Sequence, residues 1–401
     1  MQKSFDSVEF PARVGPIPYL GMAFMSQTGM SFVQQGLVIL GTFFLFMYHL
    51  NLTELGFITT SLSLGVMVSM AFVGVVVDRF GPRVVLFWGA VLMAGFSLLL
   101  LRVQKFGVLL ATLFFIGVTL AIVPSAGTKA VFTAFADRPR GLVMGIRQTG
   151  VPVGAALAAW LLPQMVPHLG MHWVYVAFAI ELWVTGWAFS AVMPAWHRVS
   201  VVGDGVRLRR EHWVKLSRPA LVAFLMVSGQ YILLTYSIAD LHQAHHLTVA
   251  MAGAVLALSQ IGGGVGRIVL GQVSDYLGGR RAPVIAFTAS LGAIMAFFVG
   301  LLPGTVSVWL LFVLWIFFGF AAVGWNALAL TWAGESVPAS HSGLAMSLTG
   351  SIVFLGSSIF PPLFGIVVDT SHRLAFGWWL LAGILALAAF IAWQAAKRTL
   401  D

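Results

Sequence analysis

Two stretches of the chain resemble each other along their length: LNLTELGFITTSLSLGVMVSMAFVGVVVDRFGPR at Leu50–Arg83 and LTVAMAGAVLALSQIGGGVGRIVLGQVSDYLGGR at Leu247–Arg280. One constant spacing pairs Gly56, Gly65, Gly74, Asp78, Gly81 and Arg83 with Gly253, Gly262, Gly271, Asp275, Gly278 and Arg280. A second constant spacing pairs Gly141 with Gly343 and Gly154 with Gly356. The sequence therefore predicts two related halves, and parallel repeats of this kind are typical of transporters that bind substrate between the halves near mid-membrane.

The composition excludes most soluble classes of protein. Of the 401 residues, 59% are hydrophobic and 9% are charged, whereas a soluble domain carries about 25% charged residues. A soluble enzyme, a nucleic-acid-binding protein and a disordered chain are excluded on this ground. Long unbroken apolar runs such as Leu109–Val123 indicate membrane-spanning helices, because the strands of a membrane barrel alternate in polarity.

Glycines, prolines and clusters of charge divide the chain into spans of about 20 residues, the length that crosses a bilayer. The sequence predicts an all-α membrane protein with two pseudo-symmetric six-helix bundles, residues 1–193 and 218–401, joined by a cytoplasmic linker loop at 194–217. The twelve expected spans are 17–48, 53–77, 83–101, 106–133, 140–166, 171–193, 218–241, 248–274, 282–302, 306–333, 342–368 and 374–396.

The distribution of charge predicts the orientation. When the N-terminus is placed in the cytoplasm, most of the 22 lysines and arginines lie in cytoplasmic segments. We therefore expect both termini in the cytoplasm and the chain in the inner membrane. Asn51-Leu-Thr-Glu54 is typical of a capping box that opens the second span. The sequence contains no cysteine and no phosphate-binding loop, and we expect a monomer in the lipid bilayer without cofactor, metal or nucleic acid.

The segment Gly74-Val-Val-Val-Asp78-Arg79-Phe-Gly81-Pro-Arg83 resembles the loop signature of the major facilitator superfamily. The degenerate copy at Gly271–Arg280 and the segment Arg138–Pro152 add to the resemblance, which covers the whole chain. It implies a cytoplasmic gate built from Asp78, Arg79, Arg83, Asp275, Arg138 and Arg140. Tyr276 replaces a basic residue in the second copy, so we expect a weaker latch there. The glycines of the signature are expected to allow close helix approach and a tight turn.

Three cations fall within spans: Lys129, Arg147 and Arg267. An ionisable side chain within a membrane is costly and marks a functional site by default. The two spacings pair these cations with Thr331, Thr349 and Met70, so the duplication does not explain them. Glu181 is the clear mid-span acid. Three cations against one acid favour an anionic substrate, which would supply the missing negative charge.

The sequence around Arg267 is similar to the helix-8 arginine region of oxalate–formate antiporters and monocarboxylate transporters. The resemblance implies that Arg267 binds a substrate carboxylate. The helix-11 lysine of the oxalate antiporters has no match here, because that span reads SLTGSIVFLGSSIFPPLFG, which argues against a dicarboxylate. Further candidates to contact the substrate are Arg147, Lys129, Gln34, Gln230, Tyr231 and Asn326.

Simpler interpretations of these cations stay open. Lys129 could reach the cytoplasmic interface, and Arg147 could bind backbone carbonyls or pair with Glu335. We expect a secondary transporter, not an enzyme, that moves a monocarboxylate or aromatic acid by alternating access with a proton or in exchange for a counter-anion. Asp240 and Glu181 are the candidates for proton coupling. The alternative is a multidrug or lipophilic-compound exporter of the same fold, in which Glu181 rather than Arg267 would matter.

Overall fold

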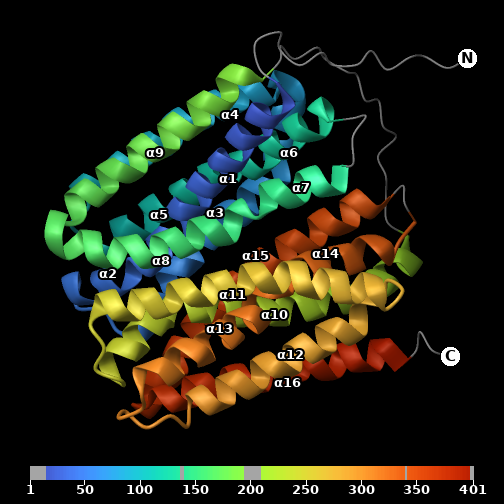
Figure 1. Cartoon of the computed structure of the whole chain (residues 1–401). Coiled ribbons are helices and arrows are strands. Elements are labelled where there is room, and N and C mark those ends of the chain that lie inside the picture. The colour runs from blue at the N-terminus through green and yellow to red at the C-terminus, as the bar shows by residue number, and fades with distance from the viewer. Residues whose placement is uncertain (1–14, 136–139, 194–208, 339–340, 398–401) are drawn as a thin grey trace, which may run out of the picture. The chain divides into compact units, whose positions relative to one another are not determined.

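The computed structural model describes residues 15–135, 140–193, 209–338 and 341–397. Within these ranges, twelve helices or pairs of consecutive helices are long and apolar enough to cross a membrane, which confirms the expected all-helical membrane fold. The first half contains α1 (Pro16–Ile39), α2 (Gly41–Met47), α3 (Leu52–Phe80), α4 (Pro82–Leu99), η1 (Leu100–Arg102), α5 (Phe106–Leu120), α6 (Ile122–Ala134), α7 (Arg140–Gln148), α8 (Gly150–Leu169) and α9 (Met171–Val192) (Figure 1). The second half contains α10 (Arg210–Gln243), α11 (Val249–Tyr276), α12 (Arg281–Val299), α13 (Val308–Gly324), α14 (Asn326–Glu335), α15 (Ser342–Ser371) and α16 (Leu374–Lys397).

Two interruptions in the spans have a proline as their cause. Proline lacks the backbone N–H that would bond the carbonyl four residues earlier. Pro124 leaves the carbonyl of Leu120 without that bond, and α5 ends at Leu120. Pro152 does the same to Gln148, where α7 ends. The chain continues from each break in nearly the same direction, because the linking residues Ala121 and Thr149 keep right-handed helical angles.

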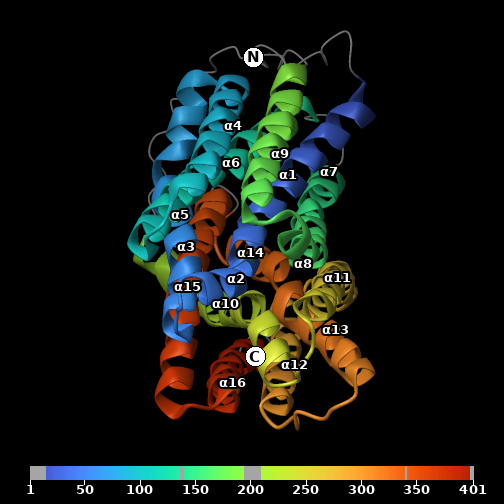
Figure 2. The same ribbon diagram turned by 90° about the vertical axis from the view of Figure 1, so that its left-hand side faces the viewer.

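Contacts divide the chain into two compact units, residues 1–35, 65–155 and 165–201 in the first and residues 36–64, 156–164 and 202–401 in the second. In the first unit α4 packs along α9 (Figure 2). In the second, α11 packs along α13, α12 along α16 and α10 along α15. The division of the chain into bundles 1–193 and 218–401 stays a prediction.

The duplication reappears in the backbone. His49 and His246 adopt left-handed conformations with φ of 52° and 57°, and they are related by the first spacing. Gly81 and Gly278 share this spacing and have φ of 84° and 73°. A left-handed residue also ends α8 and α15 at positions related by the second spacing, where one half uses Gly170 and the other His372. The two halves therefore repeat their turns as well as their sequence.

Repeated glycines hold equivalent helices together. A Cβ atom at Gly65 would lie 2.1 Å from the carbonyl oxygen of Phe114, and one at Gly262 would lie 2.3 Å from that of Ile316. Gly74 and Gly271 have no heavy atom within 4 Å of such a Cβ among the residues described. The expectation of close helix approach, made for the glycines of the signature, is wrong at Gly74 and Gly271, because these two face away from neighbouring helices. Close approach occurs instead at Gly65 and Gly262.

The helix that follows the expected linker begins earlier than the sequence suggested. α10 starts at Arg210, so the expected loop is wrong for its last eight residues or so, whereas residues 194–208 lie outside the described ranges. Leu216 is buried against Ala333, Val337 and Ala345. This apolar contact with α14 and α15 stabilises an amphipathic first turn that hydropathy alone assigns to solvent.

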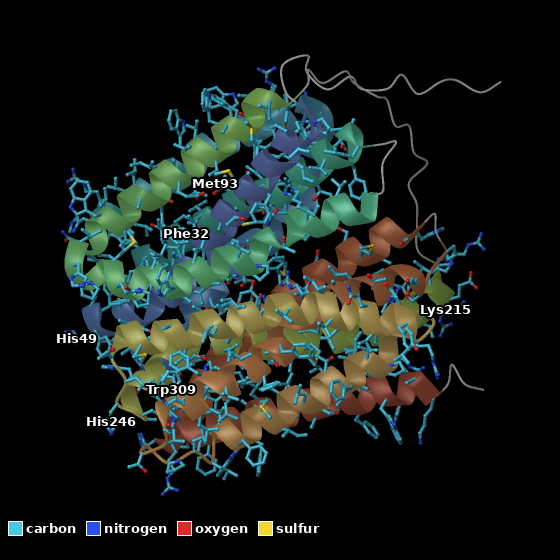
Figure 3. The ribbon with its side chains drawn as sticks, viewed as in Figure 1. Phe32, His49, Met93, Lys215, His246 and Trp309 are labelled. Atoms are coloured by element: carbon cyan, nitrogen blue, oxygen red, sulfur yellow. The ribbon has the colours of Figure 1, made fainter. Side chains whose placement is uncertain are left out.

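The start of α3 confirms the expected capping box. The Glu54 N–H donates to Asn51 Oδ1 at 2.8 Å, and the Asn51 N–H donates to Glu54 Oε2 at 2.9 Å. In the second unit His49, His246 and Trp309 lie at one end of the helices and Lys215 lies at the other (Figure 3). We call the end with the histidines the outer end, following the predicted orientation.

Candidate functional site

Arg267 lies on α11, next to a glycine that brings this helix close to α13. A Cβ atom at its neighbour Gly266 would lie 2.7 Å from the carbonyl oxygen of Phe320. This contact sets the arginine beside the break between α13 and α14, and Arg267 Nε lies 3.4 Å from the carbonyl oxygen of Val323. Tyr231 of α10 is near enough to interact electrostatically with the guanidinium. The structure therefore brings Arg267 and Tyr231 near each other, and their role in binding a substrate stays a prediction.

Among the described residues, no carboxylate forms an ion pair with Arg267. Its positive charge meets a backbone carbonyl and a phenol, both of which are neutral. Two further polar candidates are also neutral. Gln230 precedes Tyr231 on α10 and is buried, with an Oε1 that has no hydrogen-bond partner among the residues described, and Asn326 begins α14 three residues after Val323. This side of the second unit can bind an anion without first breaking an ion pair.

Arg147 occupies a similar environment in the first unit. It is fully buried, with one guanidinium nitrogen 3.1 Å from Thr128 Oγ1 and the other 3.0 Å from the carbonyl oxygen of Val123. Gly127 makes room for it, since a Cβ atom there would lie 2.5 Å from Nη2. Its Nε has no hydrogen-bond partner in the described structure. Arg147 therefore binds a backbone carbonyl, as one of the simpler interpretations expected. The other, a pair with Glu335, is not formed among the described residues, where Glu335 pairs with Arg281.

Lys129 differs from the two arginines because it has a protein acid. Its ammonium group donates to Asp78 at the end of α3. The Asp78 side chain is 69% exposed and that of Lys129 is 29% exposed. The excess of intramembrane cations that the sequence suggests is therefore reduced to Arg147 and Arg267.

The second copy of the loop signature has its own charge network. Asp275 accepts a hydrogen bond from Arg281, and Arg281 also donates to Glu335 at 3.2 Å. Sequence reasoning missed Arg281 and considered Glu335 only as a partner of Arg147, although the adjacent basic residues Arg280 and Arg281 were a usable signal. The gating roles stay predictions: Arg79 lies against Phe80, Arg83 follows the start of α4, Arg140 begins α7 and Arg138 lies outside the described residues.

The two candidate proton carriers lie in different units. The Glu181 carboxylate of α9 faces α1, where a Cβ atom at Gly29 would overlap Oε1. Its Oε2 is buried and has no hydrogen-bond partner within the described ranges. Asp240 of α10 accepts a hydrogen bond from Trp378 Nε1 at 3.0 Å. Gln34 is buried on α1 in the first unit. Neither carboxylate forms an ion pair with a cation in the part of the chain that is described.

Asp369 is a functional candidate that sequence reasoning missed. It ends α15 and accepts hydrogen bonds from the backbone N–H groups of Leu52 at 3.1 Å and Thr53 at 2.8 Å. Thr53 Oγ1 donates to it as well. A carboxylate is favourable at the N-terminus of a helix, so Asp369 ties α15 to the start of α3. A lone aspartate after an apolar run was the available signal.

Comparison with known proteins places these residues in a family. A family model described as Major Facilitator Superfamily matches residues 19–306 and 220–399. An uncharacterized MFS-type transporter of Mycobacterium tuberculosis is 28% identical over 84% of this chain and 76% of its own length. The hexuronate transporter of Bacillus subtilis is 24% identical over 86% of this chain and 85% of its own.

Another relative and a solved structure extend the comparison. The Fujikurins efflux protein of Gibberella fujikuroi is 24% identical over 79% of this chain and 67% of its own length. The crystal structure of the nucleoside transporter NupG superposes with a TM-score of 0.75 at 14% identity, over 94% of this chain and 98% of that one. At this identity the structural likeness concerns the fold.

Proposed function

Since the chain belongs to the major facilitator superfamily and is an integral membrane transporter rather than an enzyme, we propose that it moves a small organic anion by alternating access. Arg267 binds the substrate carboxylate, with Arg147 as the second cation of the transport path. The substrate travels with a proton or in exchange for a counter-anion, and the chain lies in the inner membrane with both termini in the cytoplasm.

The observation that carries this proposal is the uncompensated charge of Arg267. A guanidinium inside a membrane is costly unless it is paired, and in the described structure its contacts are neutral. A substrate carboxylate would accept two parallel hydrogen bonds from a guanidinium and neutralise it. The free protein then holds a site that becomes complete only when an anion binds.

The duplication gives a second, independent argument. Residues that maintain the fold occur in both halves, as Gly65 and Gly262 do in the same packing role. Arg267 has Met70 at the related position, although the helices that carry the two residues are equivalent. A substrate is asymmetric, so a single-copy cation suits a ligand better than it suits a duplicated scaffold.

The relatives support a hydroxylated carboxylate as the substrate. One of them is named for hexuronate, which is a sugar acid, and the polar side chains of Gln230 and Asn326 could bind hydroxyl groups near Arg267. An efflux protein stands beside it among the relatives, so an exporter of lipophilic compounds is the alternative. That alternative makes the Glu181 carboxylate, not Arg267, the important charge.

Ligand-induced stabilisation of the purified full-length protein tests the proposal. Glucuronate, lactate and benzoate are compared with neutral glucose, which matches glucuronate in size and hydroxyl groups. A carboxylate at one hundred times its dissociation constant stabilises the folded protein by about 2.7 kcal/mol. We expect this for at least one acid but not for glucose, and we expect Arg267→Ala to abolish it while Arg267→Lys retains part.

Arg373→Ala is the matched control, because it removes an arginine from the loop before α16 and should leave stabilisation intact. Stabilisation by acids that survives Arg267→Ala would overturn the assignment of Arg267. Stabilisation by rhodamine 6G alone, lost in Glu181→Gln, would favour the exporter.

A further inference from the structure

Asp240 is a buried carboxylate that the proposed anion site does not use. It lies one turn from the outer end of α10 and is 2% exposed. Trp378 Nε1 of α16 donates to Oδ1 at 3.0 Å, whereas Oδ2 is buried without a partner in the described structure. The first spacing relates Asp240 to Phe43, so the duplicated scaffold does not require an acid here.

The surroundings of this carboxylate are aromatic. The Trp378 ring lies 5.2 Å from that of Phe364, 6.0 Å from that of Phe318 and 6.5 Å from that of Trp315, measured between centroids. The indole N–H of Trp315 is already used by Ser237. One hydrogen bond offsets little of the cost of burying an ionised carboxylate, and protonation removes that cost.

A continuous row of rings connects Asp240 to the contact between α3 and α15. Phe364 stacks on Tyr236 with a centroid distance of 4.4 Å. Tyr236 lies one turn before Asp240 on α10, and its hydroxyl oxygen is 2.9 Å from the carbonyl oxygen of Leu52 and 2.6 Å from that of Pro361. We call the contacts of Tyr236 and Asp369 with Leu52 and Thr53 the outer junction.

A cavity at the outer end of the helices lies close to Asp240. A cavity of about 500 Å³ is lined by Asn51, Leu52, Gln243, Val368, Asp369, His372 and Leu374. Gln243 is three residues after Asp240 on α10, and Leu374 is four residues before Trp378 on α16. Since a helical turn rises about 5.4 Å, the hydrogen-bonded pair of Asp240 and Trp378 lies one turn below this cavity.

We propose that Asp240 is a proton-binding site whose occupancy controls the outer junction. The neutral carboxyl group favours the closed junction seen here, in which Asp240 is enclosed by aromatic rings. Ionisation favours an open junction, because only hydration can then stabilise the charge. Acid on the outer side therefore favours closing of the outer junction, whichever anion is carried.

Other titratable groups lie on the elements around Asp240, and the test must separate them. None of them forms an ion pair or hydrogen bond with Asp240 in the described ranges. α13 carries no titratable side chain. The groups are Tyr236 and His242 of α10, His245 and His246 after it, Asp369 and His372 at the end of α15, Arg373 before α16 and His49 after α2.

Cysteine labelling measures the junction directly, because the chain has no native cysteine. Thr59 of α3 is fully buried, with Oγ1 2.9 Å from Thr235 Oγ1 of α10, so Thr59→Cys reacts with a maleimide only when these helices separate. Its rate in the purified full-length protein is divided by that of exposed Gln243→Cys, which corrects for thiol ionisation. We expect the ratio to rise with pH between about 5.5 and 8.5, by up to about tenfold per pH unit, the limit for one linked proton.

Asp240→Asn is expected to give a low ratio at every pH, because the amide oxygen still accepts from Trp378 and carries no charge. Asp369→Asn is expected to raise the ratio throughout while keeping its pH dependence. Trp378→Phe removes the one donor to the ionised form, so the rise should move to higher pH; this variant also decides the matter if Asp240→Asn does not fold. A flat ratio in the parent protein, a pH dependence that survives Asp240→Asn, or one that disappears in His245→Gln or His372→Gln would overturn the proposal.

Discussion

The outer end of the second unit contains the same helix contact twice, once with a charge and once without. A Cβ atom at Gly56 of α3 would lie 2.5 Å from the backbone nitrogen of Pro362 of α15, and one at Gly253 of α11 would lie 2.5 Å from the carbonyl oxygen of Ala159 of α8. Gly56 and Gly253 are related by the first spacing. Ala159 is related by the second spacing to Pro361, which also lies against Gly56.

The two contacts differ in what bonds the start of the helix that carries the glycine. Each helix has its own capping residue at related positions, Asn51 for α3 and Thr248 for α11. Only α3 is bonded in addition by a residue of another helix, Asp369 of α15. The duplication supplied the packing, and single-copy polar residues were added to it. Arg267, Asp240 and Asp369 are all of this second kind, and we have placed function on them for that reason.

Substitution of the repeated glycines at the helix contacts should have the largest effect on stability, and the effect should be equal in the two halves. Gly65→Ala and Gly262→Ala each place a methyl group within about 2.3 Å of a carbonyl oxygen, and overpacking of this kind costs about 3 kcal/mol. Thermal unfolding of the purified protein measures the loss. If only one of the two substitutions is destabilising, the helix contacts are not equivalent.

Gly74→Ala and Gly271→Ala are the matched controls, since each lies on the same helix as one of the tested glycines and meets no heavy atom within 4 Å. Alanine in a helix interior is favoured over glycine by about 0.5–1 kcal/mol. These two substitutions should therefore leave stability unchanged or raise it slightly.

Removing the cation of the inner ion pairs should lower stability by different amounts in the two halves. Arg281 has a side chain 14% exposed and bonds both Asp275 and Glu335, whereas Lys129 is 29% exposed and bonds Asp78. The acids of all three pairs are at least half exposed, so each pair contributes less than about 1 kcal/mol, and Arg281 makes two of them. Arg281→Gln should lower the unfolding temperature more than Lys129→Gln does.

High salt provides the control for this inequality. Salt screens exposed pairs, so both contributions should decrease at high salt and the difference between the two variants should decrease with them. Equal losses for the two variants at low salt would show that the second copy of the signature holds no more tightly than the first. The expectation of a weaker latch there, based on Tyr276, would then regain support.

The fold was predictable from sequence because it depends on patterns that repeat. Long apolar runs gave the spans, and the glycines at fixed spacings gave the duplication. What escaped prediction depends on single side chains brought together from distant positions, as with Asp369 and Leu52 or Arg281 and Glu335. Lys129 illustrates the limit: its position in a span was clear, but its pairing with Asp78 requires the packing of α6 on α3.

The outer loops offer the smallest and most specific contrast. The first spacing relates Tyr48 to His245, and burial disfavours the charged form at both positions. It raises the pKa of Tyr48 and lowers the pKa of His245, in the second case against a backbone hydrogen bond at Pro303 and with a further contribution from His246. Histidine titrates near neutral pH and tyrosine does not, so burial changes the titration near neutral pH only in the second half.

The sign of the pH dependence follows from the lowered pKa of His245. Unfolded histidine takes up a proton near its ordinary pKa of 6.5, and the folded protein takes it up only at lower pH. Stability is therefore complete above about pH 6.5 and falls as the pH drops from there through the pKa of the folded state. His245→Tyr makes the two loops alike and should remove this part of the acid sensitivity of unfolding. His172→Tyr, at an exposed position of α9, should not. An unchanged acid loss in His245→Tyr would show that the buried histidine does not titrate with unfolding, and the two loops would then be equivalent in this respect too.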